Sequence, residues 1–400
     1  MPDEEAVIVA TARSAIGRAN KGSLVDYRAD ELMATILNAL MDKVPEVEKA
    51  DIVDIICGNV AQQGETGFSI ARTAGILAGF PLSVPGLTIN RFCSSSLQAI
   101  RSAGHAIKAG EGEVFIAAGV EKSSRPPEPE GGAPAAPRGR GIGPGGLNPK
   151  LLGRDPGFPF VYIPMGMTAE NVAEKFKVSR EDQDAFAKLS QDRAVAAQES
   201  GFFGREISPV TKDDGTVVSK DDCPRPGTTL ERLAELQPAF KPEGGTVTAG
   251  NACPLNDGAA AVLVMSRTRA DQLGLKPLAR IIASAVSGND PEIMGVAPID
   301  AIPRALAAAN MKISDVDIVE LNEAFAAQVL PVCRETGIDI ETQLNPHGGA
   351  IALGHPFGMT GARIMTTLIN DLQTLDKSIG VETMCAAGGM AMAMVIERLS

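Results

Sequence analysis

Apolar residues along this chain follow two periods, one typical of helices and one typical of strands. After Cys93, Leu97, Ile100, Ala103 and Ile107 are spaced as on one face of a helix that packs on a core. Similar patterns predict helices at 29–44, 168–201, 298–309 and 362–372, and strands at 51–55, 84–89, 317–321 and 392–397. Because helix and strand signals alternate, we expect an α/β sandwich with mixed sheets.

The two halves of the chain carry similar patterns. Residues 51–55 read DIVDI and residues 317–321 read DIVEL, each after an amphipathic helix. Cys93 lies 42 residues after the start of the first segment, and His355 lies 38 residues after the start of the second. The pattern indicates an internal duplication, with a pseudo-twofold relation that brings the two helix starts together.

The segment 345–361 reads NPHGGAIALGHPFGMTG and surrounds His355 with glycine and proline. Small residues leave room for a ligand to approach the backbone closely. A helix predicted just after His355 would place the imidazole near the positive end of a helix dipole and keep it neutral. His355 is therefore a candidate general base.

Two cysteines lie in segments suited to the same chemistry. Cys93, in NRFCSSS (90–96), follows an apolar stretch and precedes a helix, so free N–H groups there are expected to stabilise a thiolate nucleophile. Cys385, in TMCAAGGM (383–390), lies beside a glycine turn and is a candidate proton carrier.

These segments, together with TAGN (248–251) and NEAF (322–325), resemble the motif set of the thiolase family, in the family's order and over Ala6 to Arg398. The resemblance implies a duplicated five-layer α-β-α-β-α sandwich with an inserted loop domain. It implies an N-terminal half at 1–120 completed by 247–274, a loop domain at 121–246 that covers the substrate, and a C-terminal half at 275–400. NRFCSSSLQ, PEIMG (291–295) and ETMC look most like actinobacterial thiolases that degrade lipids and sterols.

The resemblance also implies the roles of individual residues. Cys93 would be the nucleophile, His355 the base, Cys385 the acid, and Asn322 the holder of a water beside the first oxyanion. The N–H groups of Cys93 and Ala387 would form the second oxyanion hole, with Ala387 in place of the usual glycine. The implied activity is that of an acetyl-CoA C-acyltransferase (3-ketoacyl-CoA thiolase). An acetyl-CoA C-acetyltransferase acting on acetoacetyl-CoA is the alternative.

Coenzyme A would then be a substrate rather than a permanently bound cofactor. The family's CoA-contacting positions correspond to Arg225, Ala249, Cys253 and Met165. Cys253 replaces a serine hydroxyl, which weakens any hydrogen bond to pantetheine. Pro164 stands where biosynthetic acetoacetyl-CoA thiolases carry histidine, which favours longer or ring-bearing acyl chains.

Composition excludes several other classes of function. Lys plus Arg number 37 and Asp plus Glu 49, a net charge of −12, which argues against nucleic acid or an anionic membrane as the main partner. We expect no membrane span, signal peptide or transit peptide, and therefore a cytoplasmic bacterial enzyme. The six cysteines form no CxxC pair, so neither a metal site nor a disulfide is expected. The resemblance to the thiolase family implies a homodimer or homotetramer.

Other readings remain open from the residues alone. Asn322 and Glu323 could also form an exposed turn or a helix cap, and His105 could lie on the surface of a helix. Cys57 and Cys333 are expected to be small buried apolar residues, and His347 is assigned no role. The Gly- and Pro-rich segment 131–146 predicts a surface excursion. The rival functions are a decarboxylating condensing enzyme, which would need a second catalytic histidine or asparagine in place of Cys385, and a non-catalytic lipid- or thioester-binding protein.

Overall fold

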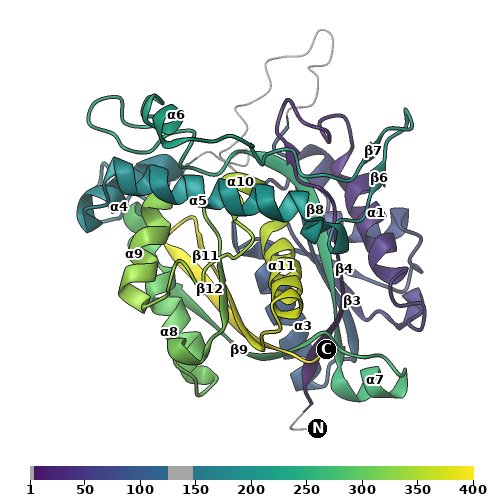
Figure 1. Cartoon of the computed structure of the whole chain (residues 1–400). Helices are drawn as coiled ribbons and strands as arrows, with labels where there is room; N and C mark the ends of the chain where they lie inside the picture. The colour runs from purple at the N-terminus through teal and green to yellow at the C-terminus, as the bar shows by residue number, and fades with distance from the viewer. Residues whose placement is uncertain (1–3, 125–146) are drawn as a thin grey trace.

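A ten-stranded sheet runs through the protein, which is described by a computed structural model over residues 4–124 and 147–400. Its path is β10-β11-β12-β9-β1-β8-β5-β3-β4, with β2 beside β8 (Figure 1). The strands are β1 (Ala6–Arg13), β2 (Gly17–Arg18), β3 (Asp54–Gly58), β4 (Gly86–Ile89), β5 (Val114–Glu121), β8 (Asn256–Ser266), β9 (Ala279–Gly288), β10 (Ile318–Leu321), β11 (Ile379–Ala386) and β12 (Met390–Arg398). A separate hairpin pairs β6 (Val210–Thr211) with β7 (Val217–Val218).

The sheet consists of two copies of one arrangement. In the order β1-β8-β5-β3 the pairs are antiparallel, antiparallel and parallel, and the order β9-β12-β11-β10 repeats that series. Within the sheet, the two copies are joined where Val7 and Ile8 of β1 pair with Arg280 and Ala279 of β9. The internal duplication predicted from the sequence is confirmed.

Helices cover both outer faces and fill the space between the two half-sheets (Figure 1). They are α1 (Ala29–Met41), α2 (Ile70–Leu77), α3 (Ser95–Ala109), α4 (Met165–Phe176), α5 (Arg180–Glu199), α6 (Leu230–Ala234), α7 (Arg267–Gln272), α8 (Pro298–Ala308), α9 (Ala326–Thr336), α10 (Ala350–Leu353) and α11 (Thr360–Thr374). Short 3₁₀ turns are η1 (Lys49–Asp51), η2 (Gly64–Thr66), η3 (Pro149–Leu151), η4 (Phe202–Arg205), η5 (Pro291–Val296) and η6 (Ile313–Asp315). Separate apolar cores lie under α1 and α2, around α3 and α11, and under α8 and α9.

The central helices α3 and α11 touch at their N-terminal ends. A Cβ placed on Gly361 would lie 2.3 Å from the backbone nitrogen of Leu97, so the two backbones are in direct contact. The backbone N–H of Ala362 donates to Ser96 Oγ at 2.9 Å. The expected meeting of the two helix starts is confirmed, and it brings the segments of Cys93 and His355 to one place.

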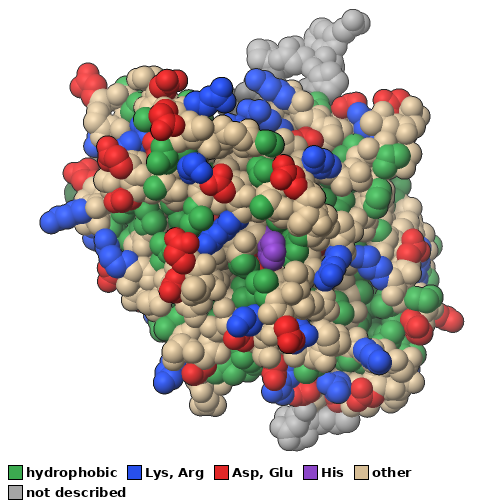
Figure 2. All heavy atoms as spheres, in the orientation of Figure 1, with side chains coloured by type: hydrophobic (Ala, Val, Ile, Leu, Met, Phe, Trp, Pro, Cys, Tyr) green, Lys and Arg blue, Asp and Glu red, His purple; other side chains and the backbone are tan. Residues whose placement is uncertain are grey.

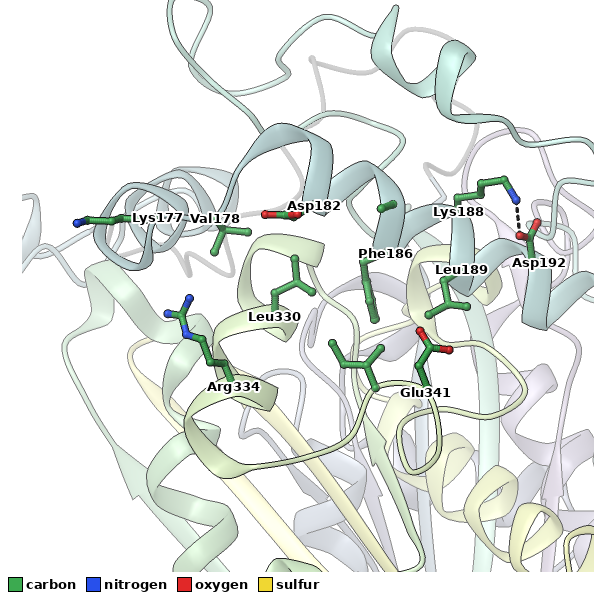
Figure 3. Close-up of a pocket in the computed structure, with 12 residues that line it drawn as sticks. Lys177, Val178, Asp182, Phe186, Lys188, Leu189, Asp192, Leu330, Arg334 and Glu341 are labelled. Atoms are coloured by element: carbon green, nitrogen blue, oxygen red, sulfur yellow. Dashed lines mark hydrogen bonds and ion pairs between the residues drawn. The ribbon is translucent and has the colours of Figure 1, made fainter.

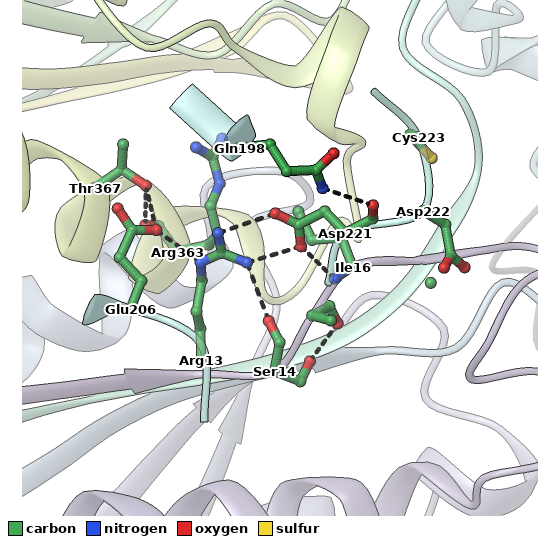
Figure 4. A network of polar contacts seen from close by, with 12 residues as sticks. Arg13, Ser14, Ile16, Gln198, Glu206, Asp221, Asp222, Cys223, Arg363 and Thr367 are labelled. Atoms are coloured by element: carbon green, nitrogen blue, oxygen red, sulfur yellow. Dashed lines mark hydrogen bonds and ion pairs between the residues drawn. The ribbon is translucent and has the colours of Figure 1, made fainter. Parts of the chain in front are cut away.

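The segment between the halves is fastened to β1 by a buried arginine. Arg13, the last residue of β1, donates to Glu206 at 2.7 Å and to both Asp221 oxygens at 2.9 and 3.0 Å (Figure 4). All three side chains are buried, so the pairs are shielded from solvent screening. Figure 1 shows α4, α5 and α6 lying across one end of both half-sheets.

The sandwich fold expected from the sequence is confirmed, but element boundaries differ. The predicted helix 168–201 is two helices, because Lys177 takes a left-handed φ of 54° and Ser179 caps α5 by accepting from Asp182 N. The segment 131–146 lies outside the described residues, and the division at 120, 246 and 274 stays a prediction.

Acidic and basic side chains are interspersed on the face shown in Figure 2. Within residues 4–124 and 147–400, no helix is long and apolar enough to cross a membrane.

Candidate active site

Cys93 lies in the turn between β4 and α3, as predicted. The turn is held by Ser95, whose Oγ accepts from Arg91 N at 2.9 Å and donates to Phe92 O at 2.6 Å. Phe92 has a left-handed φ of 47°, a strained conformation for a residue with a side chain. N–H groups near the sulfur lower the pKa of Cys93, as expected, but burial outweighs them and raises it to about 12.

His355 is buried in the loop between α10 and α11, and one side of its ring is fixed. Its Nδ1 lies 2.6 Å from Thr360 Oγ1, and that hydroxyl donates to Pro356 O at 2.8 Å. Because the hydroxyl hydrogen is used on Pro356, Nδ1 carries the proton that Thr360 accepts. The other ring nitrogen, Nε2, is then an unprotonated base.

Neutral His355 is confirmed, although the physical cause differs from the one predicted. Burial lowers the pKa of His355 to about 3, and the positive charge of Arg363 lowers it further. The contribution expected from the helix start is not needed to explain this. In the resting protein the candidate base is an imidazole and the candidate nucleophile is a thiol.

Asn322 and Glu323 follow β10 directly and are both buried, so the reading of this segment as an exposed turn is wrong. Asn322 Nδ2 lies 3.3 Å from His355 Nε2 and donates to it in the tautomer above. Glu323 accepts from Ser190 of α5, Asn345 and the backbone of Ile351. It ties the Asn322 segment to α5 and to the loop before His355.

Two further thiols border Cys93. Cys385 is fully buried at the end of β11, just before the turn in which it was expected, and its pKa is raised well above the ordinary value by burial and then by Cys93 and Cys253. The N–H of Ala387 is directed at the Cys93 sulfur, where together with the N–H of Cys93 it lowers the thiol pKa. These two N–H groups are those expected for the second oxyanion hole.

The TAGN and NEAF segments pair beside the thiols. Cys253 N donates to Ala324 O at 3.0 Å and Ala326 N donates to Asn251 O at 2.9 Å. Asn251 in turn accepts from Thr248 N at 2.8 Å, which leaves Ala249 exposed at the tip of the loop.

A packed apolar cluster lies next to these loops. Met165, Phe325 and Cys385 belong to one apolar cluster, and Phe240 packs edge-on against Phe325 with ring centroids 6.2 Å apart. A Cβ on Gly166 would lie 2.2 Å from the Phe240 ring, so a glycine is required there. Arg225 is exposed, and its backbone N–H donates to Gln191 Oε1 at 2.8 Å.

Sequence reasoning missed several residues that shape the site. Thr360 and Glu323 lie inside recognised motifs, and their polar side chains next to a candidate histidine and amide were an available signal. Asn256 accepts from the backbone N–H of His355 at 2.9 Å, and Met294 joins the apolar cluster. Asn256 lies far in sequence from His355, so only the fold reveals its role, whereas Met294 lies within the quoted PEIMG segment (291–295).

The other histidines lie outside the site. His105 is exposed on α3, and His347 stacks on Phe202 with ring centroids 3.6 Å apart while its Nδ1 lies 2.5 Å from Asp371. Cys57 and Cys333 are buried, as expected, and all six cysteines are free thiols. No group of acidic, histidine or cysteine side chains in the described part of the chain is arranged to hold a metal.

A surface cavity of about 590 Å³ lies between α5 and α9 (Figure 3). Phe186, Leu189 and Leu330 form its apolar floor, and charged residues such as Lys177 and Arg334 surround it. Neither the thiols nor His355 line this cavity. The candidate reactive residues lie in the motif loops instead.

Comparison with known proteins matches both halves of the chain. The family model "Thiolase, N-terminal domain" matches residues 6–268, and "Thiolase, C-terminal domain" matches residues 275–398. A beta-ketoadipyl-CoA thiolase of Acinetobacter baylyi is 45% identical, over 99% of this chain and 100% of the relative. A 3-ketoacyl-CoA thiolase of Cronobacter sakazakii is 44% identical, again over 99% and 100%.

Solved structures agree over the whole length. An acetyl-CoA acetyltransferase of Bacillus anthracis is 40% identical with a TM-score of 0.87, covering 99% of both chains. The dimeric peroxisomal thiolase of Saccharomyces cerevisiae is 40% identical with a TM-score of 0.88, covering 99% of this chain and 97% of that one.

Proposed function

Because the chain belongs to the thiolase family and is an acyltransferase, we propose that it is a 3-ketoacyl-CoA thiolase working through an acyl-enzyme on Cys93. It would cleave a 3-ketoacyl-CoA with CoA to acetyl-CoA and a shortened acyl-CoA. The observation that carries the proposal is the fixed tautomer of His355, which leaves Nε2 as a base next to Asn322.

In the first half-reaction, His355 takes the proton of Cys93 as the sulfur attacks the 3-keto carbon. A resting ion pair is disfavoured because the thiol pKa is about 12 and the imidazole pKa about 3. Proton transfer therefore accompanies attack, when the substrate oxygen takes up negative charge. The imidazolium, with a water on Asn322, stabilises that oxygen.

The carbon–carbon bond then breaks, and Cys385 protonates the departing acetyl-CoA enolate. A buried thiol with a raised pKa holds its proton until a strong base such as an enolate forms. The acyl group stays on Cys93 with its oxygen facing the N–H groups of Cys93 and Ala387. CoA enters beside Met165, Ala249 and Cys253, with Arg225 on its nucleotide. Its thiol gives its proton to the Cys385 thiolate and attacks the acyl carbon, and the Cys93 sulfur leaves and takes back the proton from His355.

The direct test is mass spectrometry of the protein mixed with acetyl-CoA. We expect an acetyl group on the peptide that contains Cys93, and none in the Cys93→Ala variant. Acetylation confined to another cysteine would contradict the proposed nucleophile.

For the acyl chain, we propose a substrate longer than acetoacetyl-CoA, in degradation of lipids or sterols. Support comes from the apolar side chains of Met165, Phe240 and Phe325, which pack beside the motif loops, and from Pro164, which precedes α4 and offers no polar side chain. Each buried CH₂ contributes about 0.8 kcal/mol. The relatives named beta-ketoadipyl-CoA thiolase make a dicarboxylic chain the second candidate.

Thiolysis assays across acyl chains separate these substrates. We expect kcat/KM to be higher for a medium-chain or sterol side-chain 3-ketoacyl-CoA than for acetoacetyl-CoA. A steady fall with chain length would favour the short-chain alternative, and a maximum with 3-oxoadipyl-CoA would favour the dicarboxylic one.

We also propose that the working form is a homodimer, extended to a tetramer as the family resemblance suggests. β4 is the last strand of the sheet, and apolar side chains on and around it are exposed. A similar solved thiolase is described as dimeric. The proposed location remains cytoplasmic.

A further inference from the structure

Glu121, the last residue of β5, is a buried carboxylate with three backbone donors. Its Oε2 accepts from Val60 N at 3.0 Å and Gly358 N at 2.9 Å, and its Oε1 accepts from Ala61 N at 3.0 Å. No lysine, arginine or histidine in the described parts of the chain forms an ion pair with it. One charge therefore links the end of β5, the chain after β3 and the loop of His355.

The loop of His355 rests on backbone from the N-terminal half. A Cβ on Gly358 would lie 2.5 Å from Val120 O and 2.6 Å from Gly58 O, and a Cβ on Gly119 would lie 2.0 Å from Gly358 O. Gly358 lies midway between His355 and Thr360, the residue that fixes its tautomer. A displacement of Gly358 therefore moves the base relative to the nucleophile.

Side chains of the N-terminal half hold three N–H groups of this region. Asn256 accepts from His355 N, Glu121 from Gly358 N and Ser96 from Ala362 N. Only Glu121 carries a charge, and charge-assisted hydrogen bonds are roughly twice as strong as neutral ones.

We propose that Glu121 is a positioning residue whose negative charge holds the His355 loop against the N-terminal half, so that loss of this charge lowers activity. The inference rests on the proposed acyl transfer by Cys93 and His355, and it adds the group responsible for the acidic limb of the pH profile.

The surroundings of Glu121 support this assignment. Burial raises the pKa of Glu121 to about 7, the three N–H groups lower it, and Asp257 on β8 raises it. Cys57 on β3 and Cys93 also face it, and Lys122, next in the chain, pairs with Asp257 at 3.5 Å. Since the pKa values of His355 and Cys93 are about 3 and about 12, neither titrates near neutrality.

Protonation would weaken this linkage in two ways. The carboxyl group loses the charge that strengthens all three bonds, and one oxygen becomes an O–H that faces an N–H donor. The loop is then held by Asn256 and Ser96 alone.

Glu121→Gln keeps the shape of the side chain and removes the titration. We expect wild-type kcat/KM to rise with pH through about 7. The variant should be roughly tenfold slower at pH 8, and its activity should be flat between pH 6 and 8. Glu121→Asp should be slow but keep an acidic limb.

Asp317→Asn is the matched control, because Asp317 also accepts two backbone N–H groups, from Ser378 at 3.0 Å and Ile379 at 2.9 Å, on the far side of the C-terminal half. It should lower thermal stability and keep the wild-type pH profile. If Glu121→Gln does not fold, Asp257→Asn serves instead, and it should shift the acidic limb to lower pH.

An unchanged acidic limb in Glu121→Gln, an unshifted limb in Asp257→Asn, or a wild-type profile without a limb would overturn this inference alone. Absence of acetylation on Cys93 at every pH would instead contradict the proposed function.

Discussion

At the residue scale, burial determines the protonation of the groups proposed to react. Cys93, Cys385 and His355 are all neutral in the resting protein because the interior disfavours their charged forms. The sequence identified these three residues from their motifs. It did not predict that burial outweighs the N–H groups at Cys93, because a turn before a helix does not reveal how far the fold shields the sulfur from solvent.

The first prediction concerns Thr360, which fixes the His355 tautomer. Thr360→Val has nearly the same volume but cannot accept from Nδ1, so the Nε2–H tautomer becomes populated and the base is blocked. We expect kcat to fall about 10- to 100-fold, as for other residues that orient a reactive histidine. Thr360→Ser keeps the hydroxyl and should stay near wild type. Equal loss in both variants would mean that the methyl packing, and not the hydroxyl, is what matters.

The second prediction separates the two proposed catalytic thiols. Cys93→Ala should abolish both thiolysis and the acyl-enzyme, whereas Cys385→Ala should lose turnover while still accepting a slow acyl group from acetyl-CoA. Steady-state thiolysis and intact-protein mass spectrometry measure the two properties independently. Turnover near wild type in Cys93→Ala would refute the mechanism.

At the element scale, amphipathic patterns predicted α1, α3 and α8 well because each places one apolar face on a core. The pattern also predicted α11, although that helix is buried on all sides from Thr360 to Leu372. These patterns did not predict what happens between helices and strands. The break at Lys177 depends on a left-handed turn, and Glu323 is held by a hydrogen bond from Ser190 of α5. Such features come from contacts between segments distant in sequence.

A cluster of buried charges on β10, β11 and α11 is another such feature. Glu320 and Glu382 are paired in register on β10 and β11, and Asp371 and Arg363 approach from α11. Burial raises the pKa of all three acids, and three acids share one arginine. Neither Glu382 oxygen has a protein hydrogen-bond partner among the described residues.

The third prediction is that Glu382→Gln stabilises the protein at alkaline pH. The pKa of Glu382 is higher in the folded protein than in the unfolded chain. The folded protein therefore has its full stability at pH values below the unfolded-state pKa, and it loses stability as the pH rises from there towards the folded-state pKa. The loss is about 1.4 kcal/mol per pH unit in that window. The melting temperature of the variant should therefore match wild type near pH 4 to 5 and exceed it at pH 8. Glu46 is exposed, so Glu46→Gln is the control, and its melting temperature should equal that of wild type at both pH values. A variant less stable than wild type at pH 8 would show that Arg363 needs the Glu382 charge.

At the scale of the whole molecule, the duplication explains why residues from both halves of the chain meet in one site. The N-terminal half supplies Cys93, the C-terminal half supplies His355, Asn322 and Cys385, and α3 and α11 meet between them. The sequence predicted this arrangement from two similar segments and from motif order. It did not show which outer surface stays uncovered, because exposure depends on how the elements pack.

That uncovered surface surrounds β4 and leads to the last prediction. Phe68 is 94% exposed, Leu82 76% and Leu87 46%, and hydrogen bonds join their segments to α2 and β4. An end strand with exposed apolar side chains is a pairing surface for another chain. We expect wild-type protein to show at least twice the chain mass of 41.6 kDa in light scattering. Leu87→Lys should shift it towards the single-chain mass, because a buried, unpaired charge opposes association.

Val217→Lys is the matched control, since Val217 is 57% exposed on β7, away from β4. It should keep the wild-type mass. Cys93 follows β4 by only four residues, and its neighbour Phe92 is 38% exposed. A second copy of the chain that covers this face would therefore restrict the motion of the strained turn at Phe92. For this reason the monomeric Leu87→Lys variant should also have a lower kcat. A wild-type protein that is monomeric at assay concentration, or a monomeric variant with full activity, would show that each chain works alone.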